Sequence, residues 1–131
     1  MIEVVTVARA ARRDFQFVSG TEYMISAGAI GASGLLSALA TVSPRLVRGL
    51  YDLCRAEKYK DARRPQEDAA ILFRVFHETG AAGLKAAVGL MGRDCGRPRP
   101  PLPAFDEARA QALIVELSAV ETVKSEPRGW S

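Results

Sequence analysis

Residues 17–44 read FVSGTEYMISAGAIGASGLLSALATVSP, and from Tyr23 to the end of this stretch no residue carries a charge. A helix that crosses a bilayer needs about 20 apolar residues, so a transmembrane helix is one possible interpretation. The composition argues against it, because glycine and serine are frequent, large aliphatic residues are few, and glycine is a poor helix former. We therefore predict a helix from Tyr23 to about Ile30, a turn at Gly31, and a buried strand around 34–37.

The sequence before this stretch predicts a second strand and a short helix. Residues 15–18 are a β-prone run, which Ser19 and Gly20 are expected to end. Residues 2–13 have apolar positions at helical spacing and predict an amphipathic helix. Two strands joined by a crossover helix form a parallel unit. Two parallel strands alone leave faces and edges uncovered, so the sheet is expected to be incomplete.

The sequence after this stretch predicts helices. The predicted segments are a helix from Pro44, helices over 58–77 and 82–91, an irregular proline-rich loop over 93–103, a last helix over 106–124, and a loose tail over 125–131. Pro65 is expected to kink or split its helix, and Gly80 to end it. The residues expected to face the core are Leu46, Val47, Leu50, Leu53, Cys54, Ile71, Leu72, Val75, Phe76, Leu84, Ala87, Val88, Met91, Ala110, Leu113, Ile114 and Leu117.

Composition indicates one globular domain with no metal site. The chain has 131 residues, of which 48% are hydrophobic and 25% charged, and its net charge of +3 is weak evidence for a nucleic-acid partner. Cys54 and Cys95 lie far apart, so neither a zinc site nor a disulfide is expected. His77 is the single histidine and has no partners for a metal site. The N-terminal residues lack the pattern of a signal peptide, and a cytoplasmic location is expected.

Five segments, in order and at matching spacing, resemble the dihydrodipicolinate synthase and N-acetylneuraminate lyase family of Schiff-base pyruvate lyases. They are FVSGTE at 17–22, GASGLLS at 31–37, TVSP at 41–44, GLKAA at 83–87 and GRDCGRPRPPL at 92–102. They are similar to the end of the family's seventh strand, its eighth strand, its Asn-Val-Ala-Pro turn, its Val-Lys-Ala-Ala helix, and its Arg-x-Pro-Leu loop. Each motif alone is unspecific, but five in the correct order and at the correct spacing are specific, and the match runs from about Ile2 to Leu117, nearly the whole chain.

This resemblance implies an α/β fold that is mainly helical as it stands. The family folds as a (β/α)₈ barrel, which needs about 250 residues, followed by extra C-terminal helices. The chain is expected to hold the last two barrel strands with their helices at 1–57, the C-terminal helical region at 58–124, and a tail at 125–131.

The resemblance also implies chemistry that this chain does not carry by itself. In the family, a lysine on strand six forms a Schiff base with pyruvate or a related 2-oxo acid, and a tyrosine and a Thr-Thr-Gly segment assist. None of these can be matched here, because the lysines at 58, 60, 85 and 124 fall outside predicted strands. No catalytic residue and no cofactor are therefore expected, and a nucleophilic role for Lys85 is the disfavoured alternative.

What remains by resemblance is the wall of a substrate pocket. Gly20, Thr21, Leu36 and Ser37 would lie at the carboxyl ends of the two strands, with Leu36 beside the imine. The simpler alternative is that Gly20 ends a strand and Leu36 belongs to the core. Two functions stay open: an inactive fragment of a lyase or aldolase, whose 2-oxo acid binds only in a completed barrel, or a non-catalytic module that associates with itself or with the rest of the barrel. Neither nucleic acid nor membrane is an expected partner, and the parent enzyme's substrate stays open.

Overall fold

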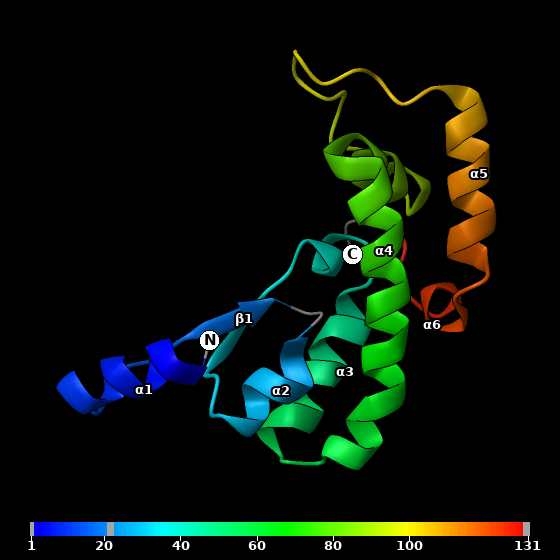
Figure 1. Cartoon of the computed structure of the whole chain (residues 1–131). Coiled ribbons are helices and arrows are strands. Elements are labelled where there is room, and N and C mark those ends of the chain that lie inside the picture. The colour runs from blue at the N-terminus through cyan, green and yellow to red at the C-terminus, as the bar shows by residue number, and fades with distance from the viewer. Residues whose placement is uncertain (1, 21–22, 130–131) are drawn as a thin grey trace.

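The computed structural model describes residues 2–20 and 23–129, and it is mostly helical with one small parallel sheet (Figure 1). In chain order the elements are α1 (Ile2–Ala11), β1 (Val18–Gly20), α2 (Met24–Ala29), β2 (Gly34–Leu36), the 3₁₀ helix η2 (Ala38–Thr41), α3 (Pro44–Arg55), α4 (Tyr59–Leu90), α5 (Glu107–Ser118) and α6 (Glu121–Lys124). This order confirms the predicted α/β class, mainly helical in this chain.

The sheet consists of β1 and β2, paired in parallel with α2 as the crossover. Its register pairs Val18 with Gly34 and Gly20 with Leu36. A Cβ on Gly34 would lie 2.8 Å from the Val18 Cγ1 atom, so a larger residue at position 34 would force the Val18 side chain out of its present position. The prediction of a strand over 15–18 is wrong by three residues at its start and two at its end, because pairing with β2 places β1 at Val18–Gly20.

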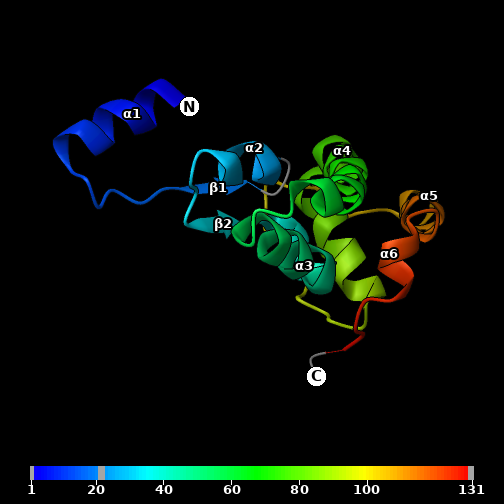
Figure 2. The same cartoon turned by 90° about the horizontal axis from the view of Figure 1, so that it is seen from below.

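Helix α1 stands apart from the other helices (Figure 2). The Arg9 guanidinium connects it to the α2–β2 turn, donating hydrogen bonds of 2.9 Å to the carbonyl oxygens of Ile30 and Gly31. Gly31 has a φ of +83°, and a Cβ there would lie 3.0 Å from the Arg9 Nη2 atom, so the turn predicted at Gly31 is confirmed. The exposed aliphatic residues of α1 are Ile2, Val4 and Val7.

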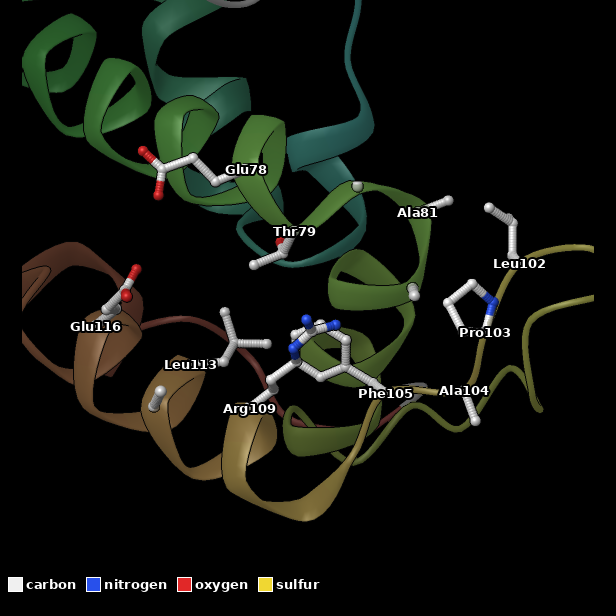
Figure 3. A pocket seen from close by; sticks show the side chains of 13 residues that line it. Glu78, Thr79, Ala81, Leu102, Pro103, Ala104, Phe105, Arg109, Leu113 and Glu116 are labelled. Atoms are coloured by element: carbon white, nitrogen blue, oxygen red, sulfur yellow. The ribbon is translucent and has the colours of Figure 1, made fainter.

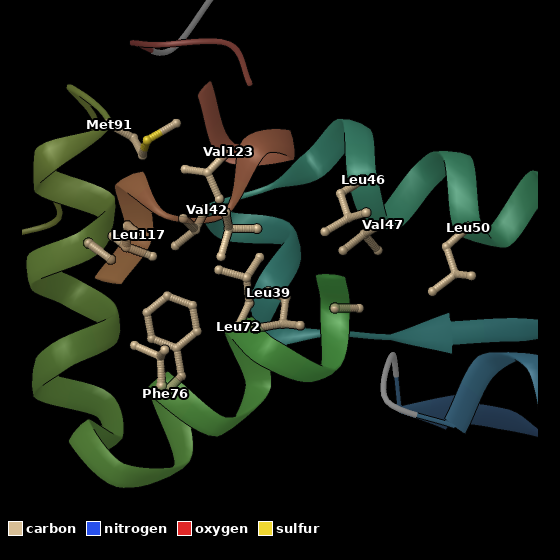
Figure 4. Close-up of a cluster of buried hydrophobic side chains, with 14 of the residues drawn as sticks. Leu39, Val42, Leu46, Val47, Leu50, Leu72, Phe76, Met91, Leu117 and Val123 are labelled. Atoms are coloured by element: carbon tan, nitrogen blue, oxygen red, sulfur yellow. The ribbon is translucent and has the colours of Figure 1, made fainter. Parts of the chain in front are cut away.

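The core lies where α3, α4, α5 and the η2 turn meet (Figure 4). Its buried side chains include Leu39, Val42, Leu46, Val47, Leu50, Leu72, Phe76, Met91, Leu113, Leu117 and Val123. Helix α2 adds Met24, which is completely buried. Most of the predicted inward positions are confirmed, but Ile71 is wrong, because 42% of its surface is exposed on the outer side of α4.

Helix α4 contains two residues that were expected to interrupt it, Pro65 and Gly80. The segment runs from Tyr59 to Leu90 through Pro65, and Gly80 is its one residue with non-helical backbone angles (φ 62°, ψ −160°). The chain changes direction between Thr79 and Ala81 (Figure 3). The expected end of the helix at Gly80 is confirmed, and a split of the helix at Pro65 is wrong, because the backbone angles there are helical. Proline removes one intrahelical hydrogen bond, and the packing of a long helix compensates for that loss.

The C-terminal segment packs against the body of the molecule. Glu126 is buried, and its carboxylate accepts hydrogen bonds of 2.9 and 2.8 Å from the backbone N–H groups of Arg45 and Leu46 at the start of α3. The Gly129 N–H donates to the Met91 carbonyl oxygen at 2.8 Å. The expected loose tail is therefore wrong for residues 125–129. The single helix predicted over 106–124 divides into α5 and α6.

The uncharged stretch that raised the transmembrane alternative contains α2, β2 and η2. Among the helices of the described residues, none is both long and apolar enough to span a membrane.

Candidate functional site

The carboxyl ends of the two strands lie side by side, because the register pairs their last residues, Gly20 and Leu36. Ser37 follows directly after β2. Three of the four predicted wall residues are thus brought together at the carboxyl end of the sheet. Thr21, the fourth, lies outside the described residues.

The two faces of this sheet differ in what covers them. Ser19 and Leu35 form a pair, and Ser19 is buried while Leu35 packs against the helical core. Side chains alternate between the faces of a strand, so the neighbouring residues point the other way. On that opposite face Val18 is 61% exposed and Leu36 is 78% exposed. One face is therefore covered by helices, and the other presents two large aliphatic side chains and two glycines without cover from the described residues.

Leu36 does not belong to the core of this chain. An exposed fraction of 78% contradicts the alternative that made it a core residue. Gly20 is the last residue of β1 itself, paired with Leu36, and not a turn after the strand. The role of both residues beside a reacting group stays a prediction.

Ser37 holds the turn that leaves the sheet. Its hydroxyl oxygen accepts a hydrogen bond of 3.1 Å from the Leu39 N–H and so caps the start of η2. The turn returns the chain from the strand end to the core, where Leu39 is buried. Sequence reasoning placed Ser37 at the rim but missed this capping role, which Ser-x-Leu spacing alone does not indicate.

A groove of about 590 Å³ runs along the outer edge of β2. Its strand side is formed by residues 34–37, and its helix side includes Val47, Arg48 and Tyr51 of α3. The Tyr51 hydroxyl donates to the Ser33 carbonyl oxygen at 3.3 Å, and the Arg48 guanidinium lies 5.6 Å from the Tyr51 ring centre. The side-chain hydrogen bond from Arg48 to Asp52 raises the pKa of the guanidinium. The groove lies beside the strand edge that has no strand partner in the described part of the chain.

The lysines lie on helices or between them, none of them on the sheet. The Lys85 Nζ atom donates to the carbonyl oxygens of Cys95, Gly96 and Arg97 at 2.8, 3.3 and 3.4 Å. Its observed contacts therefore hold the loop after α4. Lys124 forms a 2.6 Å ion pair with Glu121. Neither arrangement is that of a nucleophile at a strand end.

Within residues 2–20 and 23–129, no group of three or more His, Cys, Asp or Glu side chains is placed to bind a metal ion. His77 stacks on Phe73, with ring centres 5.8 Å apart. Cys54 is buried and Cys95 is exposed, and both are free thiols. Burial raises the pKa of the Cys54 thiol.

A separate hollow of about 340 Å³ lies between the Gly80 bend of α4 and helix α5 (Figure 3). Its lining includes Glu78, Phe105, Arg109 and Glu116. It has no lining residue in the sheet, and no motif in the sequence indicated it.

Comparison with known proteins gives one consistent result. Residues 1–120 match the model of the "Dihydrodipicolinate synthetase family". An uncharacterized DapA-like lyase of Halobacterium salinarum is 34% identical over 111 residues, which are 82% of this chain and 36% of that protein. The 4-hydroxy-tetrahydrodipicolinate synthase of Archaeoglobus fulgidus is 28% identical over 123 residues, which are 92% of this chain and 43% of that protein. The chain thus spans about two fifths of the length of these relatives.

Solved structures give the same fold. The dihydrodipicolinate synthase of Thermotoga maritima superposes with a TM-score of 0.80 at 22% identity, over 92% of this chain and 42% of that one. A putative dihydrodipicolinate synthetase of Pseudomonas aeruginosa superposes with a TM-score of 0.74 at 25% identity, over 88% of this chain and 40% of that one.

Proposed function

Because the chain belongs to the dihydrodipicolinate synthetase family, we propose that it forms the last two strands and the following helices of a (β/α)₈ lyase barrel. The completed barrel would form a Schiff base with pyruvate or a related 2-oxo acid. Coverage of about two fifths of each relative supports this division of the barrel. The parallel pair with its crossover helix is the repeating unit of such a barrel.

The observation that carries the proposal is the uncovered face of the sheet. Val18 and Leu36 are exposed there, whereas Ser19 on the other face is buried. Helices cover only the outside of a (β/α)₈ barrel, and side chains of the strands fill its interior. The uncovered face is thus the one that would look into the barrel, and exposed aliphatic side chains on it indicate a surface that packs on further strands.

Within this proposal the chain supplies part of the pocket wall. Gly20, Leu36 and Ser37, with Thr21, would border the site at the carboxyl ends of the strands, where barrel enzymes place their chemistry. A Schiff base needs an amine nucleophile, and all four lysines of this chain lie outside its strands. The reacting lysine would therefore come from a strand that the other part of the barrel provides. By itself the chain is expected to be inactive.

Borohydride trapping with pyruvate tests the proposal. One sample holds this chain alone, and the other holds it co-expressed with the part of the Archaeoglobus fulgidus synthase that it does not cover. Intact mass spectrometry should find no pyruvate adduct on this chain in either sample and an adduct on the complementing segment only when both are present. A stoichiometric adduct on this chain alone would overturn the proposal, and Lys85→Arg would then identify whether that lysine reacts.

A non-catalytic association module is the second candidate, and the exposed aliphatic side of α1 favours it. Val4 and Val7 are both exposed and lie three residues apart, on one side of the helix, where they form an apolar surface that a partner would cover. Size-exclusion chromatography with light scattering distinguishes the two functions. A stable complex of identical chains that never captures the complementing segment favours the module, and exchange into a complex with that segment favours the divided barrel.

A further inference from the structure

A second hollow, of about 410 Å³, lies next to the groove along β2 and shares two lining residues, Ala40 and Pro44, with it. Four segments form it: Thr41 and Pro44 from the turn into α3, Leu84 and Val88 from α4, the loop after α4, and the C-terminal segment. Its size falls within the range of small-molecule sites, about 300–1,000 Å³. Most of its lining is apolar, and this suits a ligand with a short hydrocarbon chain.

The charged groups that line this hollow are all positive. They are Lys85 and Arg93, and no aspartate or glutamate contributes to its lining. Two carboxylates neighbour lining residues along the chain, and neither is part of the lining. Asp94 accepts a hydrogen bond from the Gly96 N–H at 2.8 Å, and Glu126 accepts hydrogen bonds from the N–H groups of Arg45 and Leu46. Within the described residues, neither cation forms an ion pair with a carboxylate.

Arg93 is the unusual member of this pair, because only 8% of it is exposed. Its Nη2 atom donates to the carbonyl oxygens of Val42 at 3.1 Å and Pro127 at 3.3 Å. Its Nε atom is buried and has no acceptor among the described residues. A buried charge is costly unless it is paired, and neutral carbonyl dipoles leave the positive charge of the guanidinium in place.

Lys85 lines the same hollow and shows the same pattern. Its ammonium group donates to three carbonyl oxygens of the loop after α4 and to no carboxylate. Among the described residues, neither of the two cations in this hollow has a counter-ion, and most of the remaining lining is apolar.

We propose that this hollow binds a small carboxylate with a short, branched apolar chain. The carboxylate would lie between Arg93 and Lys85, where it would supply the missing negative charge through charge-assisted hydrogen bonds. The apolar chain would pack against Leu84 and Val88. Because Ala40 and Pro44 line both this hollow and the groove along β2, the ligand would contact the turn that begins directly after Ser37.

A titration of the full 131-residue chain followed by methyl NMR tests this site. The probes are isovalerate, isoamyl alcohol and isoamylamine, which share a hydrocarbon chain and differ in charge. Isovalerate is expected to shift the methyl signals of Leu84 and Val88, and the alcohol and the amine are expected to bind at least about tenfold more weakly, since each hydrogen bond to a charged group contributes about that factor. The signals of Val75, which lies in the core outside the hollow, should not move.

Three variants test which positively charged side chains bind the carboxylate. Lys85→Gln and Arg93→Gln should each weaken isovalerate binding about tenfold, and the exposed Lys60→Gln on the same helix should leave it unchanged. Lys85 is partly exposed, so this variant carries the test even if Arg93→Gln unfolds. Equal affinity for all three probes, shifts away from Leu84 and Val88, or no binding of isovalerate would each overturn the proposal. Neither pyruvate nor Schiff-base chemistry enters this measurement, so its result is independent of the proposed function.

Discussion

The carboxylate of Glu126 is expected to be among the most important polar groups for the stability of this chain. It accepts two hydrogen bonds, of 2.9 and 2.8 Å, from the backbone N–H groups of Arg45 and Leu46. These N–H groups belong to the first turn of α3, where no intrahelical acceptor exists. The N-terminus of a helix also carries a partial positive charge that an acidic group stabilises.

Glu126→Gln keeps the size of the side chain and removes its charge. The amide oxygen can accept one of the two hydrogen bonds, and the amide nitrogen then faces the second N–H group as another donor. An unpaired buried donor costs about 1–3 kcal/mol, and a lost bond to a charged group costs a similar amount. We expect the free energy of unfolding to fall by about 2 kcal/mol.

Urea denaturation followed by circular dichroism measures this loss, and Glu121→Gln is the matched control. The Glu121 carboxylate lies in the same C-terminal region, is 77% exposed and pairs with Lys124 at the surface, so its replacement should cost under about 0.5 kcal/mol. Equal losses for the two variants would refute the conclusion that the C-terminal segment caps α3.

Two further predictions test the sheet and the core. Gly34→Ala should destabilise the chain by about 1–3 kcal/mol, because the new Cβ would lie 2.8 Å from the Val18 Cγ1 atom. The control Gly49→Ala has no atom within 4 Å of its Cβ position and should be neutral or stabilising. If urea denaturation finds Gly49→Ala the less stable variant, the predicted clash at position 34 is wrong. Iodoacetamide at neutral pH should label the exposed Cys95 and spare the buried Cys54. Burial blocks access to Cys54 and raises the pKa of its thiol, so little of the reactive thiolate is present. If mass spectrometry finds both thiols labelled at equal rates in the native chain, the buried position of Cys54 is wrong.

Much of the fold could be predicted from local sequence. Helix α2, the turn at Gly31, strand β2 and the start of α3 at Pro44 depend on residues that act within a few positions of themselves. The stop at Gly80 is of the same kind, because a positive φ favours glycine at the position itself.

The features that sequence reasoning missed depend on distant contacts. Strand β1 begins three residues later than predicted because its position is set by pairing with β2. The C-terminal segment is held by two hydrogen bonds between the Glu126 carboxylate and the start of α3, which lies about 80 positions away along the chain. Local composition carries no signal for either contact.

One part of the candidate functional residues could be predicted from sequence motifs, and another part could not. Motif order placed Gly20, Leu36 and Ser37 at neighbouring strand ends, and the register brings them together. The uncompensated charges of Lys85 and Arg93 became visible only in three dimensions, because η2, α4 and the C-terminal segment form their hollow together.

The central claim is that the exposed sheet face, with Leu36 on it, becomes the interior of a completed barrel. Its most direct test compares Leu36→Asp with Val115→Asp in the two-chain trapping experiment. Both side chains are exposed in this chain, at 78% and 69%, but Val115 lies on α5, away from the sheet. Leu36→Asp is expected to prevent assembly with the complementing segment and to abolish the pyruvate adduct on that segment, whereas Val115→Asp should leave both unchanged. Normal assembly and a normal adduct with Leu36→Asp would contradict the central claim.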